Sequence, residues 1–241
     1  MSCVNFLDCY NQPFVIFGGF TSFPVVYAGL RRTLSRLTSQ PTSIVPIQSY
    51  EWLLAVRQAG WSSILKKLDR TVNELVNKSP SGKVTLVGHS IGGVVSRLYL
   101  SDSPFRGRIY SGLDYVDHLI TLGSPHINHG GLTRGGHVSR AINAQVPGAA
   151  YFPHVRYTSV AGKWLRGTRF GPRLARIVYD LYDSIGGDGT AWGDGLVPLE
   201  SAILPGSHPV ILEGVSHYTI FGKTWFGNED VVPRWLEAAA N

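Results

Sequence analysis

The segment around Ser90 constrains the fold of this 241-residue chain more than any other. Residues 84–87, Val-Thr-Leu-Val, form a short apolar run that is typical of a buried strand. The turn Gly88-His89-Ser90-Ile91-Gly92 follows, and apolar residues then recur with helical spacing from Val94 to Leu100. Small residues two positions before and after a serine allow a strand and a helix to approach closely. We therefore predict that Ser90 lies in a strained turn, with its hydroxyl exposed above a sheet.

Apolar runs elsewhere in the chain predict a parallel sheet covered by helices. Strands are predicted at residues 14–17, 43–47, 84–87, 119–122, 155–161 and 210–212. Apolar residues three and four apart predict helices at 24–37, 64–76, 91–100, 174–181 and 231–236, whereas 126–150 has little regular pattern. Strands that alternate with helices indicate an α/β fold with a mainly parallel central sheet and helices on both faces.

The chain is expected to form one domain over residues 1–241, because no linker-like stretch divides it. It has no run of about 18 apolar residues, so no transmembrane helix is expected. The N-terminus lacks the basic and apolar regions of a secretory signal. These features leave cytoplasmic, organellar and membrane-peripheral locations open. Cys3 and Cys9 are expected to be free thiols.

A serine nucleophile needs a histidine base, which a parallel sheet holds beyond the carboxyl end of a strand. His217 lies five residues after Leu212, the end of the last predicted strand. His208 precedes that strand, and His118 begins another, so both lie at the opposite edge. We therefore predict His217 as the base.

The base needs an acid that holds its tautomer, and two similar segments offer one. Asp194 lies between two glycines and precedes the last strand, which gives the chain order Ser, Asp, His. Asp188 has the same neighbours and stays as the alternative. Asp180 and Asp183 lie on a predicted helix and are interpreted as its solvated face.

Two backbone N–H groups are expected to stabilise the negative charge that develops on the substrate oxygen. The residue after the nucleophile, Ile91, supplies one of them at the start of a helix. The loop after the first strand supplies the other, with Phe20 as the predicted donor and Gly19 next.

Four segments resemble serine lipases and esterases of the α/β-hydrolase superfamily: residues 17–20 (Phe-Gly-Gly-Phe), 88–93 (Gly-His-Ser-Ile-Gly-Gly), 121–126 (Thr-Leu-Gly-Ser-Pro-His) and 193–198 (Gly-Asp-Gly-Leu-Val-Pro). The last two are similar to those of bacterial triacylglycerol lipases and their plant and cyanobacterial relatives. The resemblance implies an α/β-hydrolase fold with a short lid-like insertion and a Ser90-Asp194-His217 triad. Residues in or beside these segments are expected to contact substrate: Gly19, Phe23, His126 and Leu196. No calcium ligands can be matched to positions of this chain.

Positive charge is concentrated in the middle of the chain. No acidic residue occurs from His118 to Tyr179, whereas this stretch carries eight cationic residues: Arg134, Arg140, Arg156, Lys163, Arg166, Arg169, Arg173 and Arg176. Such a block suits an anionic lipid surface or an acidic substrate, and a plain solvated insertion stays as the alternative. No recognition motif accompanies it that would indicate nucleic acid. We expect a basic insertion, at about residues 126–190, to act as a lid and to contact anionic membranes.

These features predict an enzyme that cleaves carboxylic esters of acyl lipids through an acyl-enzyme on Ser90. Transfer of the acyl group to an alcohol acceptor uses the same intermediate and stays as the alternative. A non-catalytic lipid-binding scaffold is disfavoured because all three triad members are present. No metal or other cofactor is expected, since the histidines show no metal-ligand spacing.

Overall fold

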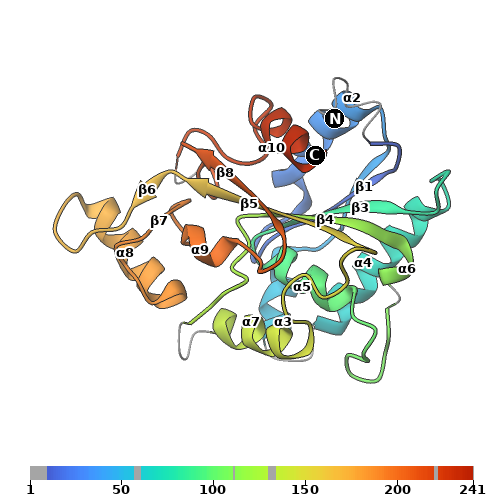
Figure 1. Cartoon of the computed structure of the whole chain (residues 1–241), viewed down its shortest axis with the longest axis horizontal. Helices are drawn as coiled ribbons and strands as arrows, with labels where there is room; N and C mark the ends of the chain where they lie inside the picture. The colour runs from blue at the N-terminus through green and yellow to red at the C-terminus, as the bar shows by residue number, and fades with distance from the viewer. Residues whose placement is uncertain (1–9, 57–60, 111, 130–133, 220–221, 241) are drawn as a thin grey trace.

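The computed structural model describes residues 10–56, 61–110, 112–129, 134–219 and 222–240; Cys3 and Cys9 lie outside these ranges. A six-stranded sheet runs through the molecule in the order β2-β1-β3-β4-β5-β8 (Figure 1). Every neighbouring pair in it is parallel. Its strands are β1 (Phe14–Phe17), β2 (Thr42–Ile44), β3 (Val84–His89), β4 (Val116–Leu122), β5 (Arg156–Lys163) and β8 (His208–Glu213). This confirms the predicted α/β architecture.

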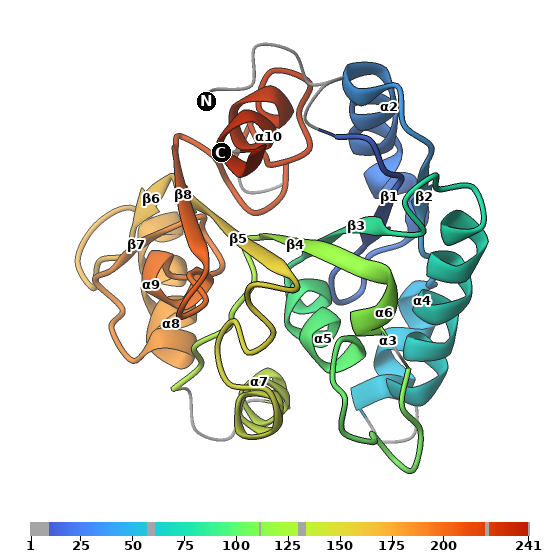
Figure 2. The ribbon, with the colours of Figure 1, turned by 45° about the vertical axis from the view of Figure 1, so that its right-hand side comes forward.

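Helices cover both faces of the sheet (Figures 1 and 2). One face carries α2 (Ala28–Thr38) and α10 (Val232–Ala240), with the short 3-10 helix η1 (Pro24–Tyr27) leading into α2. The other face carries α3 (Ser49–Val56), α4 (Trp61–Val76), α5 (Ile91–Tyr99), α6 (Gly112–Tyr115) and α7 (Arg134–Gln145). None of the helices in the described residues is long and apolar enough to cross a membrane.

Alternation along the strands divides the core into two layers. In β1, Phe14 and Ile16 belong to the apolar cluster under α2 and α10. Val15 and Phe17, from the same strand, belong to the cluster under α4 and α5. Successive strand residues point to opposite faces, so a strand buried on both sides reads as the continuous apolar run that predicted it.

Four helices were not predicted, and two of them, α6 and the helix at Leu199–Ala202, have only four residues each. α7 lies within the stretch expected to lack regular structure, because its two glycines hide the helical pattern. It packs against α5 and contributes Ile142 to the core, so tertiary contacts outweigh its weak propensity. α3 is apolar on its outer face as well as its inner one, which removes the amphipathic pattern. β2 ends at Ile44, two residues before Pro46, as a strand near a proline should.

A separate unit projects beyond the carboxyl end of β5 (Figure 2). β6 (Leu165–Arg166) pairs antiparallel with β7 (Trp192–Gly193), and α8 (Arg173–Gly186) lies between them in the chain. The short helix α9 (Leu199–Ala202) follows and packs on β5. The segment 126–190 thus includes β5, a strand of the central sheet, and only its last part projects from the fold.

Candidate active site

Ser90 lies at the turn between β3 and α5 in a backbone conformation that few L-residues adopt. Its φ is 55° and its ψ is −132°, and its N–H donates to the Leu122 carbonyl at 2.9 Å. Side chains at Gly88, Gly92 or Gly93 would collide with neighbouring atoms, so the turn needs these small residues. The strained turn expected of a nucleophile is therefore present in the backbone.

The loop after β1 covers Ser90. A Cβ atom built on Gly19 would lie 2.7 Å from the Ser90 Cβ, and Ser90 is only 7% exposed. The loop thus packs against the Cβ of Ser90, and the exposure of its hydroxyl stays a prediction.

His217 and Asp194 form a buried pair beyond the carboxyl ends of the strands. The His217 Nδ1 lies 2.7 Å from the Asp194 Oδ2, and both side chains are almost fully covered. The backbone N–H of His217 also donates to the Asp194 carbonyl at 2.8 Å. A carboxylate can only accept a hydrogen bond, so the Nδ1 of the neutral imidazole carries the proton and donates it to Asp194. The Nε2 is then a hydrogen-bond acceptor. That Nε2 has no hydrogen-bond partner among the described residues.

Backbone groups hold the Asp194 carboxylate independently of the histidine. Its Oδ1 accepts the N–H groups of Leu196 at 3.0 Å and Val197 at 2.7 Å. Gly123, with a φ of 54°, passes beside the pair, and a Cβ there would lie 2.6 Å from the Asp194 Oδ2. The glycine of the Gly-Ser-Pro-His segment is thus required by the space that the carboxylate and the imidazole occupy.

The alternative acid and bases lie elsewhere. The Asp188 carboxylate is exposed and accepts the N–H and the hydroxyl of Thr190, at 2.8 and 2.7 Å. These hydrogen bonds hold its pKa below the ordinary value of an aspartate. His118 is buried within β4, with its Nε2 2.9 Å from the Thr158 hydroxyl. His208 begins β8, at the amino edge of the sheet.

The backbone N–H groups of Phe20 and Ile91, the two predicted oxyanion donors, differ from that of Gly19 in their hydrogen bonding. Ile91 is the first residue of α5, so its N–H has no partner within the helix. No hydrogen bond from the Phe20 N–H occurs in the described parts of the chain. The Gly19 N–H, by contrast, donates to the Tyr27 hydroxyl at 2.8 Å. Phe20 and Ile91 thus keep free donors, whereas Gly19 does not.

A buried polar cluster behind Ser90 was missed by the sequence analysis. The Tyr27 hydroxyl lies 2.9 Å from the His89 Nδ1, and the His89 ring lies 4.7 Å from that of His217, between centroids. Tyr218 packs on both imidazoles. Burial, and to a lesser degree the neighbouring His217, lower the pKa of His89 well below its ordinary value. His89 is therefore neutral at pH 7 and adds no positive charge beside His217.

Tyr27 and His89 carried a weak signal in the sequence. His89 is the residue before the serine, and Tyr27 lies within the helix predicted at residues 24–37. Apolar periodicity shows that Tyr27 is buried, but it does not show what its hydroxyl contacts.

The four residues expected to contact substrate lie in different surroundings. Gly19 is against Ser90, and Phe23 is 45% exposed at the start of η1. Leu196 is half-buried beside Asp194. The His126 side chain is fully buried, with its Nε2 3.1 Å from the Thr121 hydroxyl, so in this conformation it is closed off from solvent.

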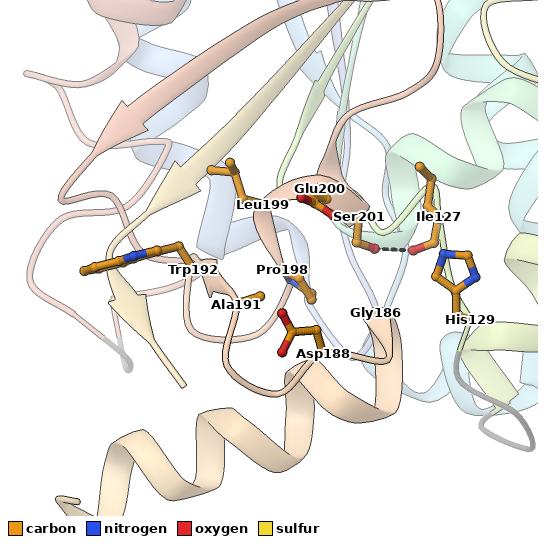
Figure 3. A pocket seen from close by; sticks show the side chains of 10 residues that line it. All are labelled: Ile127, His129, Gly186, Asp188, Ala191, Trp192, Pro198, Leu199, Glu200 and Ser201. Carbon is orange, nitrogen blue, oxygen red and sulfur yellow. Dashed lines mark hydrogen bonds between the residues drawn. The ribbon is translucent and has the colours of Figure 1, made fainter. Parts of the chain in front are cut away.

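A pocket of about 280 Å³ opens between the loop after β4, the end of α8 and α9 (Figure 3). Ile127, Trp192 and Leu199 give it apolar walls, whereas His129, Asp188 and Glu200 bring polar atoms. None of the proposed triad residues lines it. We therefore do not assign it to the reacting ester.

An exposed apolar surface adjoins the loop that covers Ser90. Phe20 and Phe23 come from that loop, and three large side chains of α3 are more than half exposed: Tyr50, Leu53 and Leu54. Trp52 joins the two parts, because its ring lies 6.3 Å from that of Phe20, and the Ser49 hydroxyl donates to the Thr21 carbonyl at 2.8 Å. We call Phe20, Phe23, Tyr50, Leu53 and Leu54 the front surface.

Among the described residues, no group of three or more His, Cys, Asp or Glu side chains is placed so that it could hold a metal ion.

Comparisons with known proteins agree on the fold. A sequence model of the family described as PGAP1-like alpha/beta domain matches residues 61–142, which include Ser90. The mature lipase BlEst2 of Bacillus licheniformis superposes with a TM-score of 0.58 at 18% identity, over 88% of this chain and 86% of that one. Est1E of Butyrivibrio proteoclasticus superposes with a TM-score of 0.53 at 15% identity, over 95% and 89%. No curated protein sequence matches the chain.

Proposed function

We propose that this chain, which has the fold of the α/β-hydrolase superfamily, hydrolyses carboxylic esters of acyl lipids through Ser90, His217 and Asp194. One observation carries the proposal. The buried Asp194–His217 pair leaves the His217 Nε2 as a free acceptor at the same edge of the sheet as the strained turn of Ser90. A free base beside a serine in such a turn is what acyl transfer to a hydroxyl requires.

In the proposed reaction, the His217 Nε2 takes the proton of Ser90 as the Oγ bonds to the ester carbonyl carbon. The tetrahedral intermediate collapses, the bond to the alcohol oxygen breaks, and His217 gives its proton to the departing alcohol. A water molecule then loses a proton to His217 and attacks the acyl-enzyme. The carboxylic acid leaves, and the proton returns to Ser90. Asp194 holds the imidazole and stabilises its charged form throughout.

The negative oxygen of each intermediate is proposed to accept the N–H groups of Phe20 and Ile91. Both donors are free in the described residues, and Ile91 lies at the positive end of α5. Tyr27 acts through Gly19 as a positioning residue, since its hydroxyl holds the preceding peptide of the loop.

The front surface is proposed to receive the acyl chain. It begins at Phe20, whose N–H is a proposed oxyanion donor, and it continues over the apolar outer face of α3. Apolar side chains that folding leaves in water have most to gain from contact with a hydrocarbon chain. The loop after β1 packs against Ser90, so it borders the path by which a substrate reaches the hydroxyl.

Labelling with a fluorophosphonate tests the nucleophile. We expect the wild-type protein to be labelled and Ser90→Ala to be unlabelled, with turnover of a p-nitrophenyl ester lower by a factor of roughly 10³ or more. Ser96→Ala is the matched control, because that buried serine lies in α5, the helix that follows Ser90, and donates to the Gly92 carbonyl. Full labelling of Ser90→Ala would show that the nucleophile is elsewhere.

A chain-length series of esters tests the substrate class. The double variant Leu53→Ser/Leu54→Ser should raise the KM for long-chain esters about tenfold and leave the KM for short-chain esters unchanged. Only a long acyl chain is expected to contact the two exposed leucines. Product analysis with an added alcohol separates hydrolysis from acyl transfer. If the ester of the added alcohol is the main product even though water is present, the result would favour acyl transfer.

A further inference from the structure

A second exposed apolar surface lies on the unit that projects beyond β5. Phe170 is 90% exposed, Leu174 is 41% exposed and Ile177 is 45% exposed. Three arginines surround them and are also exposed: Arg169, Arg173 and Arg176. We call these six residues the α8 surface.

Folding does not explain these apolar side chains. α8 is anchored by its opposite face, where Ala175, Val178 and Tyr182 are buried. Phe170 precedes the helix and lies in a stretch, residues 169–174, that is exposed throughout. A helix that is already held by one face gains no stability from leaving large apolar groups of the other face in water.

The arginines are not explained by local charges either. Among the described residues, no ion pair involves Arg169, Arg173 or Arg176. Arg173 is the first residue of α8, where the helix dipole disfavours a cation. Arg169 lies over the Tyr179 ring, at 5.2 Å, and donates to its hydroxyl.

The acidic groups near this surface lie toward one end. Asp180 and Asp183 share with the arginines a groove of about 710 Å³, and they come from later turns of α8. The loop before α8 and the first turns of the helix, residues 167–177, contain three cationic side chains, Arg169, Arg173 and Arg176, and no acidic one. Positive charge is thus concentrated around Phe170, Leu174 and Ile177.

Three other cations of the acid-free stretch lie in different surroundings. Lys163 pairs with Glu213 at 2.8 Å. Arg156 begins β5 at the amino edge of the sheet, and the Arg166 Nε donates to the Thr190 carbonyl. Exposed arginines and exposed apolar side chains thus coincide at the α8 surface.

We infer that the α8 surface docks on an anionic lipid bilayer. Exposed aromatic and aliphatic side chains flanked by arginines match the interface of such a bilayer, where apolar groups enter the acyl boundary and guanidinium groups bind phosphates. The arginines favour this occupant over a neutral one by charge complementarity. The inference goes beyond ester hydrolysis, because binding needs neither Ser90 nor turnover.

Vesicle cosedimentation tests the inference in the full chain carrying Ser90→Ala, so that hydrolysis cannot alter the lipid. Vesicles of equal parts phosphatidylglycerol and phosphatidylcholine are compared with phosphatidylcholine alone. We expect binding to the anionic vesicles to be on the order of 30-fold weaker with Arg173→Glu and Arg176→Glu. The matched control is Arg31→Glu with Arg32→Glu, which makes the same charge change at two exposed positions of α2. It should change binding less than about threefold, because α2 lies far from α8 (Figure 1).

A second pair of variants tests the apolar contribution. Phe170→Ser should weaken binding about tenfold, whereas Ile109→Ser, at another exposed apolar position, should not. Equal binding to both vesicle types, or equal losses in the α8 and α2 variants, would overturn the inference. Anionic binding that Phe170→Ser leaves unchanged would overturn the insertion of apolar side chains and leave binding of the arginines to lipid phosphates alone. The same surface variants are also made with Ser90 intact, and their turnover of a short ester is measured. This measurement distinguishes failure of the docking inference from failure of the proposed function.

Discussion

Two Gly-Asp-Gly segments lie six residues apart and have opposite surroundings. In residues 193–195 the aspartate is 1% exposed and bonds to His217 and two backbone N–H groups. In residues 187–189 the aspartate is exposed and bonds only to Thr190. The first segment follows β7 and meets the loop after β8, whereas the second follows α8 on the projecting unit.

The comparison shows that the tripeptide itself does not assign a role to its aspartate. The position of the aspartate relative to the strand ends separates the two, because Asp194, unlike Asp188, contacts the imidazole of His217 in the loop after β8. Elsewhere in the molecule, too, substitutions of covered groups should have larger effects than substitutions of exposed groups.

The largest effect should separate these two aspartates. Asp194→Asn is expected to lower turnover roughly 10²- to 10⁴-fold, because an amide no longer fixes the His217 tautomer. Asp188→Asn should change it less than about twofold. Initial rates on a soluble ester measure both. If the two variants exchange ranks, Asp188 is the acid.

Acid should destabilise the covered part of the molecule. Burial lowers the pKa of His118 to about 3, and it lowers that of His89 and His126 as well. The unfolded chain binds these protons first, near pH 6.5, so the free energy of unfolding should fall as the pH drops below that value. Each such histidine contributes about 1.4 kcal/mol per pH unit.

Urea unfolding between pH 7.5 and 5 measures this dependence. His118→Gln should make it shallower, and His137→Gln, at an exposed position, should leave it unchanged. An equal slope in all three proteins would contradict the assignment to buried histidines.

Tyr27→Phe should show a smaller effect within the same centre. Without the hydroxyl, the Gly19 peptide is no longer held, and we expect kcat to fall about tenfold with KM nearly constant. Affinity for a boronic acid that mimics the tetrahedral intermediate should fall by the same factor, which a loss of packing alone would not cause. Tyr110→Phe is the control, since that buried tyrosine packs on Tyr99, at the opposite end of α5 from Ser90. A change in KM alone would exclude the positioning role.

The smallest effect is expected at the exposed aspartate. Thr190→Val removes one of the two hydrogen bonds that Asp188 accepts, at a site open to water. The free energy of unfolding should fall by about 0.5 kcal/mol or less. Urea denaturation at pH 7.5 checks this value, and a loss above about 2 kcal/mol would mean that the turn is as tightly held as the centre.

Most of the sheet could be predicted from the sequence. Residues 14–17 and 84–87 form continuous apolar runs because helices cover both faces, and the structure has strands there. The helix α3 could not be predicted, since its exposed leucines remove the contrast between inner and outer faces.

The candidate site was less accessible to sequence analysis. Spacing from strand ends selected Asp194 and His217, which the structure brings together, although their catalytic roles stay predictions. The hydroxyl of Tyr27 meets Gly19 and His89 only through the packing of η1 on the turn after β3. No local pattern records such a contact. Composition likewise suggested one basic segment and could not show that only part of it surrounds exposed apolar residues.

The pairing of β8 with β5 has a consequence for how the protein is made. His217 follows β8, which is the last strand of the sheet to leave the ribosome, whereas Ser90 is synthesised much earlier. A nascent chain therefore carries its proposed nucleophile without a base until β8 docks beside β5. Under the proposed mechanism, the unfinished chain therefore stays inert until translation has passed the final strand.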